Sequence, residues 1–558
     1  MSRDIVAYEK VEVGLNGVHA FYPIGDDVTI VVPPTGTTRI VARSATRGDL
    51  AASLDDALRI AGLPVGTYEI VALDADGKLL GDEITTVGTH QGERPVHGFA
   101  TSFGDDDVES VVAWNGALRS TVVQIYDWME SYTEPLGSKD GWKDPSNRTV
   151  SFDALRAMAA AFTKEGVITH AYAPIYAVGN QFAHDNPAVL MYRGDGEPIQ
   201  FLDQIVLANP GNAQWQRHFV QAYGDAADAI GFDGFHVDTY GYPRVAQDAG
   251  GVAIDSRVAY ESFLEFLRTA RPDDLISFNQ VNGVPSAARI SGAPDFRYCE
   301  IWPPNTEWRH FEGLLDRSAG VAGHLAPATR STVLRGSIAC YPPVWGVDDP
   351  KGPVTGAARE SALRTDVATE AIATMLGASA LIFGDRSAAL CDPYYPKHAH
   401  LSNDEADTVI KWRHFALRCR DLFIDGEDTS WYEIGDENGS VSVETTAPVL
   451  PEPVGGSVFA RVTHGEGYIA VGVLDLTGSA NGRWTEPTSR GAVSSVTAKI
   501  LVDHPGDWHV EVAVLGSHDD RFTPMASIEV DHRQGRALQV ELPLVDGWSV
   551  LRLRRGAS

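Results

Sequence analysis

The sequence is poor in cysteine, and none of its cysteines has the spacing of a redox or metal motif. Its 558 residues include only four cysteines, with no C-x-x-C pair and no Cys/His spacing typical of zinc sites. This excludes a dense disulfide framework and favours free thiols in a reducing compartment. The opening residues 1–6 also lack the apolar run of a secretory signal. We therefore expect a cytoplasmic location; a sequence trimmed at its start would instead leave secretion open.

Positive charge and long apolar runs are also scarce. Lys and Arg total 45 against 75 Asp and Glu, a formal net charge of −30. Such a surface repels nucleic acid and anionic membranes, so neither is expected as a partner. No run of eighteen apolar residues occurs, so no membrane-spanning helix is expected. A neutral substrate suits this charge better than an anionic one, although acidity also serves simply to keep a protein soluble. The composition does not encode an oligomeric state.

The length predicts two to four domains, because a single core stops growing well below 558 residues. Residues 1–95 show short alternating runs between turn residues, among them the hairpin signal Asp76-Gly77. This pattern predicts an N-terminal immunoglobulin-like β-sandwich. Residues 429–558 return to the same kind of patterning and predict a C-terminal β-sandwich, with 445–456 as an exposed loop.

Between the two sandwiches, residues 96–428 alternate strand and helix patterns. Ser151 is placed to cap a helix that Gly166 would end, and further helices are expected over 212–230, 256–270 and 361–377. The expected strands are 98–103, 120–128, 167–173, 234–239, 275–281, 296–302, 331–339 and 380–384. Eight such alternations predict a (β/α)8 TIM barrel. A doubly wound open sheet is the alternative, but the Gly-rich turn G-x-G-x-x-G is missing after its first strand.

Polar side chains gather where the expected barrel strands end. In a barrel of this kind the active site lies at the carboxyl ends of the strands. Asp238 ends the fourth expected strand and Glu300 the sixth. Hydrolysis of a glycosidic bond needs two facing carboxyl groups. We therefore expect Asp238 to be the nucleophile and Glu300 the acid/base, with Tyr298 and Trp302 desolvating Glu300 and raising its pKa.

The other strand ends supply candidate substrate-binding residues. His236 points to the same side as Asp238, so it can bind a sugar hydroxyl, as amide side chains can. A tryptophan can stack on a sugar ring, but more often it packs in the protein core. Asp385 could bind a sugar or, alternatively, form an ion pair with a loop arginine. The complete set of candidates is Tyr126, Asp127, Trp128, Trp142, His170, Tyr172, His236, Asn279, Gln280, Asn282, Trp302 and Asp385.

Two other classes of function share parts of this pattern. A metal-dependent barrel hydrolase needs a His-x-His at the end of the first strand, where only His97 is found, before the strand. The pair His398 and His400 follows the eighth strand and reads as incidental, so no metal and no cofactor are expected. A non-catalytic carbohydrate-binding protein would have lost one of the two carboxylates, and both are present.

Four motifs, in order, resemble glycoside hydrolase family 66, the family of dextranases and cycloisomaltooligosaccharide glucanotransferases. They are Gln-Ile-Tyr-Asp-Trp-Met (124–129), Gly-Phe-Asp-Gly-Phe-His-Val-Asp-Thr (231–239), Phe-Asn-Gln-Val-Asn (278–282) and Tyr-Cys-Glu-Ile-Trp (298–302). The resemblance covers most of the chain. It implies a sandwich–barrel–sandwich core and retaining cleavage of α-1,6-linked glucans. It also implies Asp238 as nucleophile, Glu300 as acid/base, and a subsite for the attacked glucose lined by residues 126–128.

The sequence departs from the resembled family in two respects. The glucanotransferases carry a domain-sized insertion in the barrel for which the spacing here leaves no room. This favours a hydrolase, of the endo-acting dextranase kind, over a cyclising transferase. The missing secretory signal suggests a shorter, imported α-1,6 oligosaccharide or a related α-glucoside as substrate. Transglycosylation on the same glucans remains the alternative, because water and an acceptor sugar compete for one glycosyl-enzyme intermediate.

Overall fold

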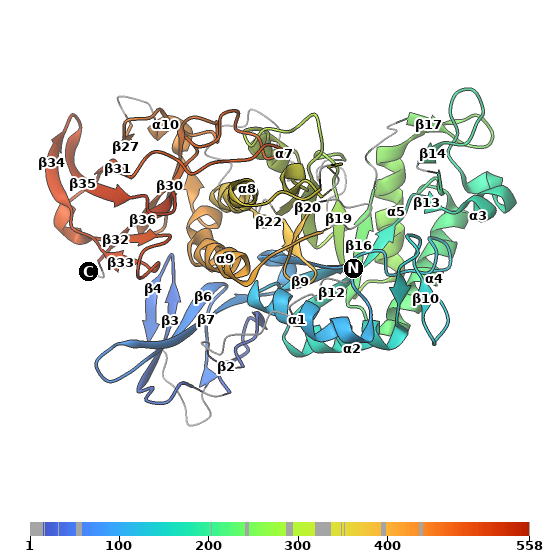
Figure 1. Cartoon of the computed structure of the whole chain (residues 1–558), viewed down its shortest axis with the longest axis horizontal. Coiled ribbons are helices and arrows are strands. Elements are labelled where there is room, and N and C mark those ends of the chain that lie inside the picture. Colours follow the sequence, from blue (N-terminus) through green and yellow to red (C-terminus); the bar gives the residue numbers. More distant parts are fainter. Residues whose placement is uncertain are drawn as a thin grey trace.

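The computed structural model consists of three parts. The barrel lies between the C-terminal β-sandwich, on the left of Figure 1, and the far right end of the molecule, and a smaller N-terminal β-domain lies next to both the barrel and the sandwich. It describes residues 15, 17–31, 33–51, 59–201, 203–239, 241, 245–285, 294–318, 336–347, 349–350, 352–391, 398–434 and 439–556. Over these ranges, no helix is both long and apolar enough to cross a membrane.

The N-terminal part consists of two sheets that share one core. Its strands are β1 (Phe21–Pro23), β2 (Val28–Thr29), β3 (Arg39–Ser44), β4 (Gly48–Ala51), β5 (Arg59–Ile60), β6 (Gly66–Leu73) and β7 (Leu79–Gly88). Five of them form a sheet in the order β1-β7-β6-β3-β4, and β2 pairs with β5. Val28 and Ile60 of the small sheet pack with Ile70 and Val87 of the large one, which confirms a β-domain here. The predicted hairpin turn joins β6 to β7.

The central part is a nearly closed barrel of eight parallel strands. They are β8 (His97–Ala100), β9 (Val122–Ile125), β12 (Ile168–Pro174), β16 (Gly234–Asp238), β19 (Leu275–Asn279), β20 (Phe296–Glu300), β21 (Ser337–Ala339) and β22 (Ser379–Leu381). Each pairs with the next in chain order, and β22 comes back beside β8. All eight predicted strands are confirmed; of the seventh, residues 331–335 lie outside the described residues.

Helices wrap the barrel. They are α1 (Val108–Ala117), α2 (Phe152–Lys164), α3 (Asn180–Asp185), α4 (Ala213–Ile230), α5 (Ser256–Ala270), α7 (His310–Ser318), α8 (Ala357–Met375) and α9 (Asn403–Ile424). Of these, α2, α4, α5 and α8 lie where the sequence pattern placed helices. The Ser151 hydroxyl accepts the amide N–H of Ala154 as the N-cap of α2, and Gly166 follows that helix with a positive φ of 71°. Helix α8 begins four residues earlier than predicted, directly after Gly356, because the residues that follow this glycine are good helix formers.

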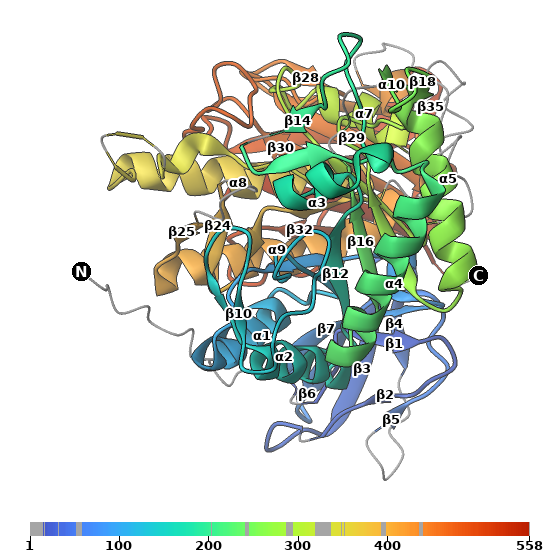
Figure 2. The same ribbon diagram turned by 90° about the vertical axis from the view of Figure 1, so that its right-hand side faces the viewer.

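Several barrel strands continue into small sheets beyond their carboxyl ends. Strands β13 (Ala177–Val178), β14 (Gln200–Phe201) and β15 (Ile205–Leu207) form one sheet after β12, and the hairpin β17 (Val245–Gln247) and β18 (Ala253–Asp255) follows β16. These elements and α3 lie at the end of the molecule farthest from the C-terminal sandwich (Figures 1 and 2). The other small sheets are formed by β10 (Trp142–Lys143) and β11 (Thr149–Val150), and by β23 (Phe383–Gly384), β24 (Ala388–Leu390) and β25 (His398–His400).

The C-terminal part is a sandwich of two antiparallel sheets. Its elements are β26 (Glu427–Asp428), α10 (Ser430–Glu433), β27 (Val441–Glu444), β28 (Val449–Leu450), β29 (Val458–Gly465), β30 (Tyr468–Asp475), β31 (Ser495–Leu501), β32 (Trp508–Val514), β33 (Thr523–Pro524), β34 (Ile528–His532), β35 (Gly535–Pro543) and β36 (Trp548–Arg555). Apolar side chains of both sheets meet in one core. The expected loop 445–456 is corrected in one detail, because β28 pairs in parallel with β29.

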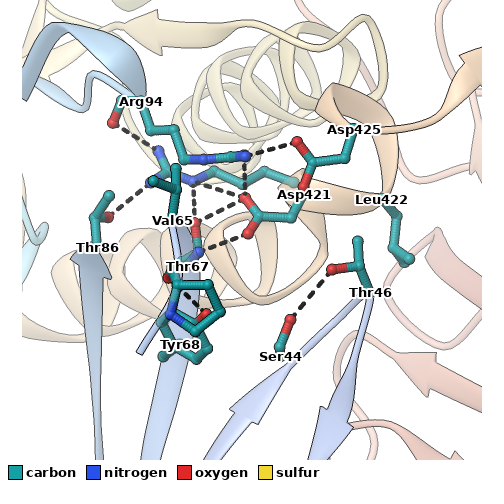
Figure 3. Close-up of polar contacts among 12 residues, drawn as sticks. Ser44, Thr46, Val65, Thr67, Tyr68, Thr86, Arg94, Asp421, Leu422 and Asp425 are labelled. Carbon is teal, nitrogen blue, oxygen red and sulfur yellow. Dashed lines mark hydrogen bonds and ion pairs between the residues drawn. The ribbon is translucent and has the colours of Figure 1, made fainter. Parts of the chain in front are cut away.

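Helix α9 fastens the N-terminal sheet to the barrel through a buried polar cluster (Figure 3). Asp421 Oδ1 lies 2.9 Å from Arg94 Nη1. The same carboxylate accepts the amide N–H of Thr67 at 2.6 Å and the Thr67 hydroxyl at 2.8 Å. One turn earlier, Arg418 binds Glu69 of the N-terminal sheet and Asp520 of the C-terminal part. These contacts fix both flanking domains against one helix.

Candidate active site

Three adjacent strands bring the two predicted catalytic carboxylates to one edge of the barrel. Strand β19 lies between β16 and β20. In the register, Val237 pairs with Phe278, so Asp238 lies beside Asn279; Asn279 in turn pairs with Tyr298, two residues before Glu300. Since side chains alternate along a strand, all three polar groups point toward the barrel mouth.

The Asn279 side chain joins the two carboxylates. Its Nδ2 donates to Asp238 Oδ1 at 2.7 Å and to Glu300 Oε2 at 2.8 Å. Because both bonds meet at one nitrogen, these two oxygens lie at most 5.5 Å apart, the sum of the bond lengths. Asp238 is buried, with 8% of its surface exposed, whereas Glu300 is half-buried. The geometry predicted for a facing carboxylate pair is therefore present.

Burial and mutual repulsion set the protonation of the pair. Desolvation is the main cause that raises the pKa of Asp238, and the charge on Glu300 adds to it. Hydrogen bonds from Tyr172, whose hydroxyl lies 2.7 Å from Oδ2, and from Asn279 act in the opposite direction. Desolvation also raises the pKa of Glu300. These effects favour a state in which one carboxyl is protonated while the other is ionised.

A cavity of about 180 Å³ opens above these carboxylates. Seven of the predicted site residues line it: Tyr126, Tyr172, His236, Asp238, Asn279, Glu300 and Trp302. His236 Nδ1 is hydrogen-bonded to the Ser277 hydroxyl at 2.9 Å, and burial lowers the pKa of His236 well below its usual value. A neutral imidazole therefore faces the cavity.

The expected stacking role of Trp128 and Trp142 is corrected by the structure. Trp128 is fully buried, and its indole N–H donates to the backbone carbonyl of Tyr172 at 3.1 Å. Trp142 is 6% exposed, and its indole N–H donates to the Trp128 carbonyl at 2.9 Å. Both rings pack in the main core rather than in the cavity. They support the wall behind Tyr126 and Tyr172 instead of presenting a face to a sugar.

His170 and Gln280 also lie away from the cavity. His170 is buried inside the barrel, where its Nδ1 is 2.9 Å from the Ser277 hydroxyl that also binds His236. The Gln280 side-chain amide donates to the Pro285 carbonyl at 2.6 Å and to the Ser318 carbonyl at 3.1 Å. In this structure His170 and Gln280 bind partners within the protein, and their substrate-binding roles stay predictions.

Asn282 and Asp385 hold loops at the barrel mouth. The Asn282 side-chain oxygen accepts the amide N–H of Trp302 at 2.9 Å, so it positions a residue that does line the cavity. Asp385 Oδ1 accepts the amide N–H groups of Thr101 and Ser102 at 2.9 and 3.0 Å. Neither side chain lines the cavity; both anchor loops in this structure, and their binding roles stay predictions.

Asp127 occupies an unusual position beside the cavity wall. Its backbone has a φ of 51°, and its carboxylate lies 3.9 Å from Arg148 Nη2. Burial raises the pKa of Asp127 to about 7, although Arg148 acts to lower it. Arg148 is itself held by Asp144, at 2.6 Å. Asp127 does not line the cavity, and its contact with a sugar stays a prediction.

The sequence analysis missed several cavity residues. These are Gln124, Tyr176, Thr239, Val281 and Tyr341, whereas Tyr298 was expected beside Glu300 and does line the cavity. The Tyr176 hydroxyl is 3.4 Å from Asp238 Oδ2, and Tyr341 hydrogen-bonds Glu300. Tyr341 follows β21 by two residues, so inspection of the seventh strand end, as of the others, would have found it. Tyr176 likewise lies two residues beyond β12, so the same inspection of the third strand end would have found it.

No metal-binding cluster occurs among the residues whose placement is described: no three His, Cys, Asp or Glu side chains are arranged to hold an ion. His398 and His400 belong to β25, where His398 Nε2 is 3.1 Å from the Thr101 hydroxyl.

Comparisons with known proteins agree with this geometry. The family model described as glycosyl hydrolase family 66 matches residues 67–551. A cycloisomaltooligosaccharide glucanotransferase from Niallia circulans is 25% identical over 286 residues, 46% of this chain and 30% of that protein. A dextranase from Streptococcus salivarius is 21% identical over 508 residues, 78% and 60% of the two chains. This chain thus spans less than two thirds of either relative.

Among solved structures, a cycloisomaltooligosaccharide glucanotransferase from Paenibacillus sp., complexed with cycloisomaltoheptaose, superposes with a TM-score of 0.76. The identity is 16%, and the match covers 96% of this chain and 98% of that one. At this identity the likeness concerns the fold, and it confirms the multidomain arrangement around a TIM-like barrel. An α-amylase from Geobacillus thermoleovorans shares less of it, with a TM-score of 0.51.

Proposed function

The chain belongs to glycosyl hydrolase family 66, and from this premise we propose that it is a retaining hydrolase of α-1,6-glucosidic linkages in dextran or isomaltooligosaccharides. The names of its relatives support the substrate class. One is a dextranase, and another was crystallised with a cyclic isomaltooligosaccharide. The net charge of −30 agrees with a neutral substrate.

The observation that carries the mechanism is that Asp238 and Glu300 both accept hydrogen bonds from Nδ2 of Asn279. Retaining glycosidases place their two carboxyl groups roughly 5–5.5 Å apart, whereas inverting enzymes need roughly 6.5–9.5 Å to admit a water molecule. The limit of 5.5 Å set by Asn279 supports retention. A direct attack by an intervening water molecule would need more space between the carboxylates.

Two steps follow from this arrangement. Asp238 attacks the anomeric carbon while Glu300 gives its proton to the leaving glycosidic oxygen, which yields a covalent glycosyl-aspartate. Glu300, now ionised, then takes a proton from a water molecule that attacks the same carbon and releases Asp238. Donors from Tyr172 and Asn279 favour ionised Asp238. The half-buried Glu300 is the more accessible of the two to leaving group and water.

The size of the cavity supports binding of one sugar ring at the reacting position. Pockets for drug-sized ligands measure roughly 300–1,000 Å³, and the catalytic cavity has about 180 Å³. It therefore encloses no more than the glucose whose bond is broken, with Tyr126, Tyr172 and Trp302 as its aromatic walls. The remainder of a longer chain must lie outside it.

The test is a time course of products from dextran and isomaltotriose, with the anomeric configuration of the first product read by NMR. We expect the wild type to release short α-1,6 oligomers or glucose as the α-anomer, and Asp238→Asn to release none. Asp233→Asn is the matched control: the same exchange in the same segment, but of a carboxylate that accepts the Thr169 amide below the barrel mouth. Intact substrates with the wild type would refute the α-1,6 assignment, and a β-anomer would refute retention.

Transglycosylation on the same glucans is the alternative outcome of the same intermediate. The lack of a domain-sized insertion does not decide the acceptor, because this chain matches 98% of the solved glucanotransferase; the preference for water rests on the dextranase, whose match covers 78% of this chain. Cyclic or elongated products in the same time course would reverse this preference.

A further inference from the structure

A second and larger cavity lies in the small sheets beyond the barrel mouth. It measures about 590 Å³, about three times the catalytic cavity. Its walls come from the sheet β13–β15–β14, which extends from β12, and from the hairpin β17–β18, which extends from β16. Backbone hydrogen bonds between Tyr192 and Gln247 in both directions, of 2.8 and 2.9 Å, join the sheet region to the hairpin. The cavity is therefore bounded by one connected unit.

Tyr176 lies between this cavity and the catalytic site. The Tyr176 hydroxyl points to Asp238, and the residue lines the catalytic cavity. Its ring belongs to an apolar cluster with Phe201, Leu207 and Ala246, and these three side chains line the second cavity. The Tyr176 and Phe201 ring centroids are 6.1 Å apart. One aromatic wall thus separates the two spaces.

The chemistry of the walls fits a neutral polyhydroxylated chain. Apolar and aromatic groups are interspersed with the side chains of Gln200, Gln247 and Arg193, which can hydrogen-bond hydroxyl groups. No carboxylate occurs among the described residues that line the cavity. Aromatic surfaces with nearby amide groups match the alternating apolar faces and hydroxyl rims of sugar rings. Among the described residues that line the cavity, an anionic ligand would find one cationic side chain, Arg193, on a strongly acidic protein.

We infer that this second cavity binds the part of the α-glucan chain that extends beyond the glucose held in the catalytic cavity. The inference rests on the proposed function and adds to it a site that selects for chain length. Because the space lies beyond the reacting ring, occupation contributes binding energy with longer substrates only. Such remote binding raises kcat/KM for long chains over short ones.

The hairpin offers a matched pair of variants to test this. Val245 and Val252 are 66% and 65% exposed on the same β17–β18 hairpin, but only Val245 lines the cavity. Val245→Trp fills part of the space, and Val252→Trp adds the same bulk outside it. We expect Val245→Trp to lower kcat/KM on dextran by about tenfold or more, while isomaltotriose is turned over as before. Val252→Trp should change neither value.

Binding provides a second readout. Calorimetric titration of isomaltohexaose and isomaltotriose into the Glu300→Gln enzyme should show tighter binding of the longer sugar. Adding Val245→Trp or Gln247→Ala should remove that preference, and adding Val252→Trp should keep it. If the wild type cleaves α-1,6 glucans but both tryptophan variants keep the same chain-length preference, the inference is overturned and the proposed function stands. If the wild type neither cleaves nor binds any α-1,6 glucan, the proposed function is refuted. The inference that an α-1,6 glucan occupies the second cavity is then refuted as well.

Discussion

Asp238 and Glu300 accept hydrogen bonds from one and the same nitrogen atom, Nδ2 of Asn279. The amide has two hydrogens on that nitrogen, so it can serve each carboxylate with one. Because Asn279 ends the strand between those of Asp238 and Glu300, the backbone ladder sets the position of all three groups. The separation of the carboxylates therefore depends on one side chain that takes no proton itself.

Asn279→Ala should impair catalysis and move its pH dependence. Loss of one preorganised donor typically costs about 10²–10³ in kcat, and we expect a fall of at least about 10² here. A hydrogen bond to an ionised carboxylate lowers its pKa, so removing it raises the pKa of Asp238 and shifts the acid limb of kcat/KM to higher pH. The measurement is a pH profile of kcat/KM on dextran.

Gln280→Ala is the control for this variant. It removes the neighbouring carboxamide, which binds the carbonyls of Pro285 and Ser318 away from the cavity. This change should lower the melting temperature yet leave the acid limb in place. An acid limb that moves equally in both variants would show that Asn279 acts through the fold alone.

Tyr172 and Tyr176 donate to the same oxygen of Asp238 from different distances, 2.7 and 3.4 Å. Tyr172→Phe removes the short bond. A hydrogen bond to a charged group contributes about 1.5–3 kcal/mol, so the acid limb should move up by about one to two pH units. Tyr176→Phe removes a long and weak bond and should shift it much less. Equal shifts in the two variants would contradict the geometry that ranks the two donors.

The barrel could be predicted because each strand is a buried apolar run between turn residues. The strand ends could not be located as well. The expected strand 120–128 is Val122–Ile125 in the structure, because the chain turns at Asp127, whose φ is 51°. Nothing in the sequence distinguishes an aspartate in this left-handed conformation from one that continues a strand. The backbone hydrogen bonds between neighbouring strands end where tertiary packing turns the chain away, so the strand ends depend on contacts that the local sequence does not show.

The catalytic pair and Asn279 could be predicted because strand ends meet at one edge of the barrel. The fate of the aromatic residues could not, since it depends on neighbours distant in sequence. Trp128 packs inward, where its indole N–H finds the Tyr172 carbonyl, whereas Trp302 remains at the cavity. The sequence alone does not distinguish a tryptophan that packs in the core from one that lines the cavity. The catalytic roles of Asp238 and Glu300 and the domain boundaries at 95 and 428 stay predictions.

Asp127 should make the protein less stable as the pH rises. Burial raises the pKa of its carboxyl from 3.8 to about 7 in the folded protein. The folded state therefore favours the protonated carboxyl. As the pH rises from about 4 to about 7 the carboxyl of the unfolded chain ionises more readily, and the folded state loses stability relative to the unfolded one. Asp127→Asn keeps a neutral group at all pH values. It should stabilise the protein at pH 8 by up to about 4 kcal/mol and hardly change it at pH 4.

The measurement is the difference in melting temperature between Asp127→Asn and the wild type at the two pH values. Asp144→Asn offers a comparison, because Asp144 holds Arg148 at 2.6 Å and the change leaves Asp127 itself in place. A stabilisation by Asp127→Asn that is equal at pH 4 and pH 8 would show that Arg148 keeps Asp127 ionised throughout.

Asp421 and Asp425 bind the same guanidinium group of Arg94 with very different exposure. The Asp421 side chain is 1% exposed and that of Asp425 is 31% exposed. Asp421→Ala leaves Arg94 and the amide and hydroxyl of Thr67 without a buried acceptor (Figure 3). Breaking a buried ion pair by removing one partner costs about 3–5 kcal/mol, whereas partly exposed pairs contribute about 0–1 kcal/mol. Asp425→Ala should therefore lower the free energy of unfolding only slightly.

Urea unfolding followed by tryptophan fluorescence, with limited proteolysis of the N-terminal sheet, separates the two variants. Equal losses would mean that Arg94, rather than the buried acceptor on α9, governs the attachment of the sheet, because both aspartates would then act only through their shared arginine.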